Sequence, residues 1–273
     1  MRFYSFLTLF AFALLITSCG GSTETMDSVK DSVTEAADGL MDEAGKAMAD
    51  APKLVPMPAT HDFPDATITN WDYQGGKFMY ETTGYEFAVP TPDADALMCA
   101  NSGKGQHAHL IINNEPYIAK YAPTFEQEVP NGEHHILTFL SRSYHESIKT
   151  DQAHKAWKVN VTDGAFTSKD PITDPMLFYS RPKGTYTGKK NTENVMLDFY
   201  PVNAPLGAGE YQVKAVVNGK EEFMIDNWQP YFLKNLPMGE NTVELTLMKD
   251  GAKVDAPLNP VTRTFTLAKD PAE

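Results

Sequence analysis

Apolar and polar residues alternate in short runs along most of the chain after residue 64, and Gly, Pro, Asn or Asp separates each run from the next. Alternation with a period of two is typical of β-strands that are buried on one face. This part of the sequence contains no long amphipathic run of the kind that forms a helix. The pattern therefore predicts an all-β fold, with strands near residues 77–81, 85–89, 107–112, 135–140, 156–161, 176–179, 195–200, 211–217, 229–233, 243–248 and 262–267.

The strand pattern occurs twice. Residues 107–114 align with 212–219, and the Pro-x-Gly-Glu turn at 130–133 aligns with the one at 237–240. A repeated supersecondary unit indicates two copies of one small domain. Short strands with frequent turns favour β-sandwiches. We therefore predict two tandem Ig-like β-sandwiches, at residues 77–165 and 166–273.

The N-terminal segment has a different character. Met1 and Arg2 precede an apolar run over residues 3–16, and small residues lead to Cys19. The run is short for a membrane span and fits a secretory signal. Together with Cys19 it resembles the lipobox of bacterial lipoproteins, although an ordinary secreted protein remains an alternative. The resemblance implies a signal peptide at residues 1–18, lipidation of Cys19 and attachment to a membrane. By the same resemblance, Gly20 after the cysteine implies the outer membrane, without indicating which face.

Residues 19–51 are acidic and contain apolar residues at steps of three and four from Met26 to Ala47. This spacing places the apolar residues on one helical face, and Pro52 ends any helix. The segment is either a helical stalk that self-associates weakly through residues 24–50 or a mobile acidic spacer. Residues 52–76 are rich in proline, and we expect them to be extended.

Charge and motif content narrow the function classes. The net charge is −13, which argues against nucleic acid as a partner, because binding phosphates requires many Lys and Arg residues. The sequence contains no nucleophile elbow, phosphate loop, His-Glu-x-x-His motif or dinucleotide fingerprint. We therefore expect the protein not to be an enzyme.

Histidines gather in the first predicted sandwich, whereas the second has none. His107 and His109 lie on one strand, roughly 7 Å apart on the same face, which we expect to point outward, while Ala108, Leu110 and Ile112 point inward. Imidazole nitrogens suit copper and zinc, and a thiolate favours copper(I). Such a site would lie within the first sandwich alone, and the alternative is a set of structural polar residues. The candidate metal ligands are His107, His109, His134, His145 and Cys99.

A Ser-Arg pair follows a predicted strand in each sandwich, at Arg142 and at Arg181, and Lys183 follows the second pair. Guanidinium groups in loops beside hydroxyls can hold a carboxylate or a phosphate. The alternative is that each Arg binds carbonyl groups of its own loop. These three residues are the candidate site for an anionic ligand.

Several motifs resemble an uncharacterised family of tandem Ig-like proteins from Bacteroidetes and cyanobacteria. The matching stretches are Gly132-Glu-His-His-Ile, Ser141-Arg-Ser-Tyr-His-Glu-Ser, Tyr179-Ser-Arg-Pro-Lys-Gly and Asp226-Asn-Trp-Gln-Pro-Tyr-Phe-Leu-Lys. The resemblance covers about residues 75 to 268, and Ser143 and Tyr144 depart from the family pattern. It implies the sandwich fold, and some members are described as phosphopeptide-binding.

These observations predict a lipid-anchored cell-envelope protein that acts as a non-enzymatic binding or adaptor module, without a cofactor. Its ligand would be a peptide, a protein or a glycan, and the resemblance adds a phosphopeptide. One alternative is a periplasmic protein that binds copper or zinc through the histidine cluster. Another is a structural envelope protein that self-associates through residues 24–50.

Overall fold

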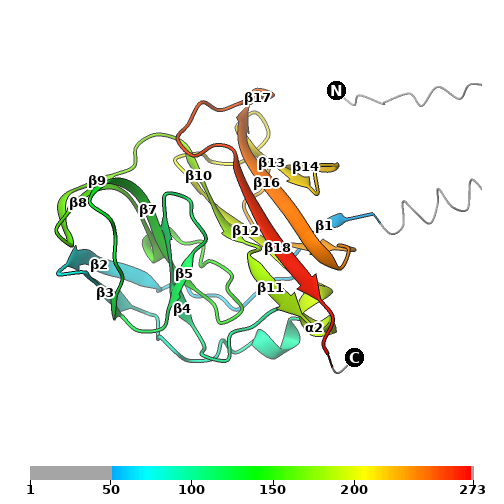
Figure 1. Cartoon of the computed structure of the whole chain (residues 1–273), viewed down its shortest axis with the longest axis horizontal. Helices are drawn as coiled ribbons and strands as arrows, with labels where there is room; N and C mark the ends of the chain where they lie inside the picture. The colour runs from blue at the N-terminus through cyan, green and yellow to red at the C-terminus, as the bar shows by residue number, and fades with distance from the viewer. Residues whose placement is uncertain (1–50, 272–273) are drawn as a thin grey trace, which may run out of the picture. The chain divides into compact units, whose positions relative to one another are not determined.

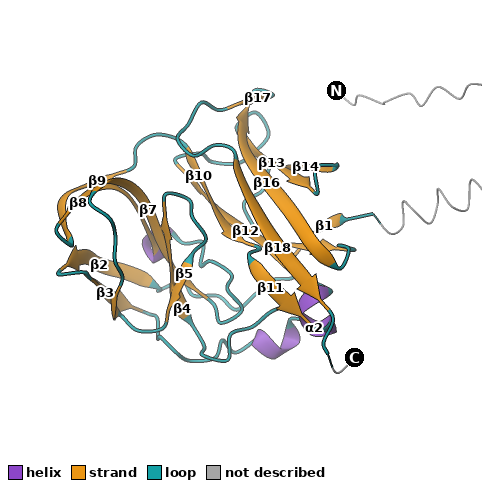
Figure 2. Cartoon of the chain, in the orientation of Figure 1, coloured by secondary structure: helices purple, strands orange, loops and turns teal. Residues whose placement is uncertain are grey.

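The computed structural model describes residues 51–271, which form β-strands joined by short turns (Figures 1 and 2). The expected signal peptide, the lipidated Cys19 and residues 24–50 of the acidic stalk lie outside the described residues. The chain from Ala51 onward forms one compact unit. No helix in the described part is long and apolar enough to cross a membrane. The predicted all-β fold is confirmed.

The first sandwich consists of a three-stranded sheet and a five-stranded sheet. A tight turn at Gly75 and Gly76, both with positive φ, connects the first two strands, as expected for a two-residue hairpin. The core between the sheets contains a cluster of aromatic rings that includes Trp71, Tyr73 and Phe78. The order of the small sheet is β2 (Thr67–Gln74), β3 (Lys77–Thr83) and β6 (Thr124–Glu126), and that of the large sheet is β5 (Ile118–Lys120), β4 (His107–Ile112), β7 (Gly132–Ser141), β8 (His154–Thr162) and β9 (Ala165–Pro171).

The second sandwich consists of a four-stranded sheet and a six-stranded sheet. The smaller sheet has the order β1 (Lys53–Pro56), β15 (Tyr231–Lys234), β12 (Val195–Val202) and β10 (Met176–Arg181). The larger has the order β11 (Gly184–Thr187), β18 (Val261–Ala268), β16 (Gly239–Lys249), β13 (Tyr211–Val217) and β14 (Glu221–Ile225), with β17 (Ala252–Lys253) beside β16. Short helical turns are η1 (Ala94–Ala96), η2 (Asp151–Ala153) and α2 (Lys189–Thr192). A core of aliphatic and aromatic residues separates the two sheets.

The predicted repeat corresponds to equivalent strands. In the larger sheets, the order β5-β4-β7-β8 of the first sandwich matches β14-β13-β16-β18 of the second. In the smaller sheets, β2-β3-β6 matches β10-β12-β15. The repeated sequence pattern thus produces the same hydrogen-bonded arrangement twice.

The expected segment boundaries differ from the observed pairing. The predicted boundary between residues 165 and 166 assigns strand β9 to the second sandwich. In the structure, β9 pairs with β8 of the first sandwich. Strands β1 and β2 lie within the Pro-rich segment 52–76, and β1 joins the second sandwich by pairing with β15. The expected strand at residues 85–89 is a turn in which Ala88 has a positive φ of 61°. Proline content and local alternation cannot predict which strands pair, because the partners are distant in sequence.

The two sandwiches share a third hydrophobic cluster. Ile111 and Phe139 of the first sandwich pack with Phe178 and Tyr200 of the second, and the rings of Phe139 and Tyr200 stack at 5.4 Å. Apolar contacts to the second sandwich therefore cover the outer face of strand β4 at Ile111.

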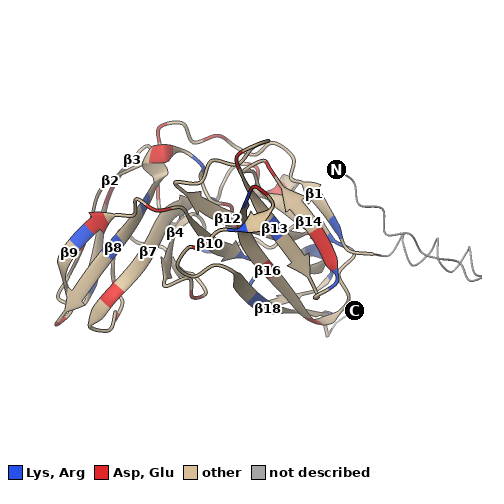
Figure 3. Ribbon diagram, turned by 90° about the horizontal axis from the view of Figure 1, so that it is seen from above, with Lys and Arg blue, Asp and Glu red and all other residues tan. Residues whose placement is uncertain are grey.

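Acidic and basic residues are interspersed on the strands of both sandwiches (Figure 3).

Candidate functional site

Strand β4 presents His107 and His109 on the face opposite the core of the first sandwich. Ala108 and Leu110 belong to that core, and Ile111 belongs to the cluster shared by the two sandwiches. The predicted alternation along this strand is confirmed. The two histidines point away from that core, as predicted, but this outer face is not open to solvent, because both residues are 0% exposed. Residues of the first sandwich surround the two rings, and Ser180 of the second sandwich also contacts His109.

His145 reaches the same place from the loop after β7. The amide of His145 donates to the carbonyl of Arg142, and the amide of Arg142 donates to the carbonyl of Glu146, each at 2.9 Å. His145 has a φ of 72°, a left-handed conformation that is uncommon for residues other than glycine and that tends to occur at functional sites. The turn brings the ring of His145 within 4.7 Å of the His107 ring, measured between centroids.

The ring nitrogens of the three histidines converge. Nε2 of His107 lies 2.9 Å from Nε2 of His109 and 2.9 Å from Nδ1 of His145. One nitrogen from each ring falls within 4.8 Å of the other two. We call His107, His109 and His145 the histidine triad. Among the described residues it is the one group of His, Cys, Asp or Glu side chains with the spacing of a metal site.

Other contacts orient two of the three rings. Nδ1 of His107 lies 2.9 Å from the carbonyl oxygen of Gly105, so it carries the hydrogen and leaves a lone pair on Nε2. Nδ1 of His109 lies 3.4 Å from the hydroxyl of Ser180, which comes from the second sandwich. Contacts of this kind to the second ring nitrogen are typical of histidines that ligate metals.

Hydrogen bonding alone does not satisfy the triad. The single lone pair on Nε2 of His107 faces two ring nitrogens at the same distance, and it accepts a hydrogen bond well from only one of them. A bound cation between the rings would accept a lone pair from each nitrogen. The geometry therefore fits a metal ion better than it fits three neutral imidazoles alone.

The three imidazoles are kept neutral. The pKa of His107 is lowered to about 4, mainly by burial and to a smaller extent by the positive charge of Arg181. Burial also lowers the pKa of His109, with the neighbouring His107 as the next cause, and that of His145, with Arg181 as the next cause. Neutral imidazole is the form that binds metals.

Tyrosine rings enclose the triad. The Tyr117 ring stacks on His109 at 3.7 Å between centroids, with an interplanar angle of 5°, and its hydroxyl lies 3.3 Å from Nδ1 of His145. The Tyr121 ring lies 4.7 Å from the His107 ring. Sequence reasoning did not identify Tyr117 or Ser180. The only signal for Ser180 was its place in the Ser-Arg motif, next to Arg181.

The predicted anion-binding residues separate into two groups. Arg181 and Lys183 lie close enough to the triad for their charges to lower the pKa of His109 and His145. In contrast, Arg142 is buried and fully engaged: it donates to the carbonyls of His61 and Ser147 and forms an ion pair with Glu146. Arg142 therefore binds its own surroundings, in line with the structural alternative.

The structure does not bring His134 or Cys99 to the triad. Nδ1 of His134 lies 2.9 Å from the side-chain amide nitrogen of Asn113, and Nε2 of His134 lies 2.8 Å from the carbonyl oxygen of Pro130. Cys99 is buried in an apolar cluster, and burial raises the pKa of its thiol to about 11. His134 and Cys99 therefore have structural surroundings of their own.

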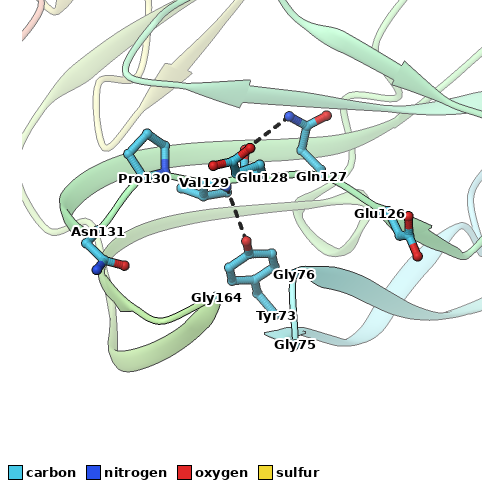
Figure 4. A pocket seen from close by; sticks show the side chains of 10 residues that line it. All are labelled: Tyr73, Gly75, Gly76, Glu126, Gln127, Glu128, Val129, Pro130, Asn131 and Gly164. Atoms are coloured by element: carbon cyan, nitrogen blue, oxygen red, sulfur yellow. Dashed lines mark hydrogen bonds between the residues drawn. The ribbon is translucent and has the colours of Figure 1, made fainter.

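A surface hollow of about 810 Å³ lies elsewhere in the first sandwich (Figure 4). Its lining includes Glu126, Glu128 and Asn131 but no Lys or Arg, and the amide of Val129 donates to the hydroxyl of Tyr73 there. Its acidic side chains are unsuited to a phosphorylated or other anionic ligand. None of the candidate site residues lines this hollow.

Comparisons with known proteins give distant similarities. No family model and no curated protein matches the chain. The fibronectin(III)-like modules of CbhA from Clostridium thermocellum align over 82% of this chain and 97% of theirs, with 13% identity and a TM-score of 0.27. The extracellular domain of a putative hybrid two-component system from B. thetaiotaomicron aligns over 75% of this chain but 38% of its own length, with 11% identity and a TM-score of 0.27. The mixed-linkage glucan utilization locus protein SGBP-B of Bacteroides ovatus, solved with a heptasaccharide, aligns over 80% and 71%, with 7% identity and a TM-score of 0.20.

Proposed function

We propose that this protein is a non-enzymatic metal-binding protein that holds one copper or zinc ion with His107, His109 and His145. The observation that carries the proposal is the convergence of three neutral imidazole nitrogens, two of them on rings whose other nitrogen has a partner. The proposed protein would be anchored to the cell envelope through a lipid on Cys19.

The choice of metal follows from the ligands. Imidazole nitrogens suit copper, zinc and nickel, whereas magnesium and calcium prefer oxygen ligands. In a tetrahedral zinc site with bonds of 2.0–2.1 Å, neighbouring nitrogens lie about 3.3 Å apart. The two separations of 2.9 Å from His107 would need to widen slightly to admit an ion, and the nitrogens of His109 and His145 lie within 4.8 Å of each other. Three protein ligands leave one position open for a further ligand.

The adaptor function, with a peptide, protein or glycan as ligand, stays a prediction. Its phosphopeptide version would rest on Arg181 and Lys183, because the guanidinium of Arg142 is already occupied. The self-associating stalk and the absence of enzymatic activity also stay predictions. Metal binding is the proposal that specific distances support.

The test is a titration of the full chain with copper(II) and with zinc, with bound metal counted per chain. We expect one ion, and we expect His145→Asn to weaken binding at least tenfold, because it removes one of three ligands. Asn tolerates the left-handed backbone at this position, so the loop should keep its fold. The matched control is His135→Gln, which removes a histidine outside the triad.

Two results would contradict the proposal. One is a stoichiometry near zero in the unaltered chain. The other is equal metal affinity in the unaltered chain, His145→Asn and His135→Gln, which would place the bound metal on surface histidines in general.

A further inference from the structure

Arg181 is a buried cation without a counter-charge. The residue is 5% exposed, and its Nε has no hydrogen-bond partner. Among the described residues, no carboxylate forms an ion pair with it, whereas the buried Arg142 and the partly buried Lys149 each have one. The ring of Tyr186 lies 5.3 Å from the guanidinium carbon of Arg181. A buried charge that lacks a partner is costly, so an unpaired Arg at this depth suggests a ligand that is anionic.

Lys183 places a second positive charge beside the triad. Its Nζ lies 3.9 Å from the centre of the Tyr117 ring, on which His109 stacks, and it donates to the carbonyl of Tyr117 at 2.6 Å. Like Arg181, Lys183 forms no ion pair with a carboxylate in the described part of the chain. Both residues come from the second sandwich, on the Ser180 side of the triad.

A divalent ion on the triad would add to this charge. Three neutral imidazoles do not offset any of it, and no carboxylate belongs to the group of potential ligands. The charge balance at this site therefore needs an anion from outside the chain.

We propose that the open position of the triad-bound metal takes a small exogenous anion, which accepts a hydrogen bond from Arg181. This inference rests on the proposed metal-binding function and specifies the fourth ligand. The ligand class is a small monoanion, such as a carboxylate or a halide-like ion. Two of the three ligand histidines are fully buried and enclosed by Tyr117 and Tyr121, which leaves little room for a larger group. Association requires no covalent or redox step.

The experiment uses the copper(II)-loaded full chain and two probe anions, azide and formate. Azide bound to copper(II) gives a charge-transfer absorption, which reports its affinity directly, and formate is followed by its competition with azide. The test variant is Arg181→Met, which removes the charge and keeps a side chain of comparable length. The control is Lys189→Gln, which removes one positive charge from an exposed position.

We expect Arg181→Met to weaken azide binding by about tenfold or more, the effect of losing a hydrogen bond from a charged donor. Copper stoichiometry should stay the same, and Lys189→Gln should bind azide like the unaltered chain. If Arg181→Met does not fold, Lys183→Met replaces it, with a loss of azide affinity expected in the same direction.

The outcomes separate the two proposals. A chain that binds no copper overturns the proposed function, and the anion site with it. A copper-loaded chain that binds no azide, or binds it equally well with and without Arg181, overturns the anion site and leaves metal binding standing.

Discussion

At the scale of single residues, the site depends on which nitrogen of each ring carries the hydrogen. The Gly105 carbonyl sets this for His107, and the Ser180 hydroxyl is the corresponding partner of His109. These partners direct the Nε2 lone pairs of both rings toward one point. The hydroxyl of Ser180 thus matters although it is not a ligand.

We predict that Ser180→Ala weakens metal binding by about tenfold, because removal of an outer hydrogen-bond partner typically costs 10–100-fold in affinity. Competition titration against a chelator measures the change. Ser168→Ala, at an exposed position on β9, is the control and should leave the affinity unaltered. Equal losses in both variants would show that the contact to His109 has no specific effect.

Only part of the triad could be predicted from the sequence. The His-x-His spacing correctly placed His107 and His109 on one face, because alternation along a strand is a local property. The same spacing could not show that this face is buried, since the covering residues come from the second sandwich. It also could not separate His145 from His134, because which loop folds back over β4 depends on distant contacts.

At the scale of elements, the loop that carries His145 is held by strand β12 of the second sandwich. Asp198 on β12 is 0% exposed, and it accepts hydrogen bonds from the amide of Ser147 at 2.9 Å and from Nζ of Lys149 at 2.6 Å. This contact ties the end of the loop to the second sandwich. Asp198 is therefore a positioning residue for His145.

We predict that Asp198→Asn lowers the free energy of unfolding by about 3 kcal/mol, because it leaves the largely buried Lys149 without its counter-charge. Denaturant titration measures this change, and metal affinity should fall as the loop loosens. Glu133→Gln removes one partner of the half-exposed pair Lys158–Glu133 and should change stability by less than about 1 kcal/mol. An equally small effect of Asp198→Asn would contradict the positioning role.

Strands were predicted well where alternation and turns coincide. The predicted strand 107–112 has the same bounds as β4, and the repeat correctly paired β4 with β13. Strand β2, in contrast, lies in a segment whose prolines suggested only an extended chain, and β9 adjoins a loop-like run of polar residues. Both depend on hydrogen bonds to a neighbouring strand, which local composition does not encode.

At the scale of the whole molecule, the second sandwich completes the site. It supplies Ser180, Arg181 and Lys183 around the triad, and Asp198 beneath the loop. The sequence favoured a metal site confined to the first sandwich, which would survive without the second. The observed contacts favour the opposite, because removing the second sandwich would take away Ser180, the partner of the His109 ring, and Asp198, which holds the loop of His145.

The shared apolar cluster makes the two sandwiches interdependent in folding. Phe178 of the second sandwich is fully buried against Ile111 and Phe139 of the first. Replacing a buried Phe by Ala typically costs 3–5 kcal/mol. We therefore predict that Phe178→Ala lowers the free energy of unfolding by about 4 kcal/mol for both sandwiches, although the substitution lies in only one.

Amide hydrogen exchange can distinguish coupled from independent unfolding, because the slowest amides report global opening. If the sandwiches unfold together, the slowest amides of β7 and β16 give one free energy, and Phe178→Ala lowers both values equally. If they unfold independently, only β16 responds, and the triad would lose its cover from the second sandwich without losing β4. The control Phe223→Ala removes a half-buried ring on β14, an edge strand of the larger sheet of the second sandwich, whereas β10 belongs to the smaller sheet, and it should cost much less. A metal ion held between two such coupled units would stabilise both, so the added ion should slow exchange in β16 as well as in β7.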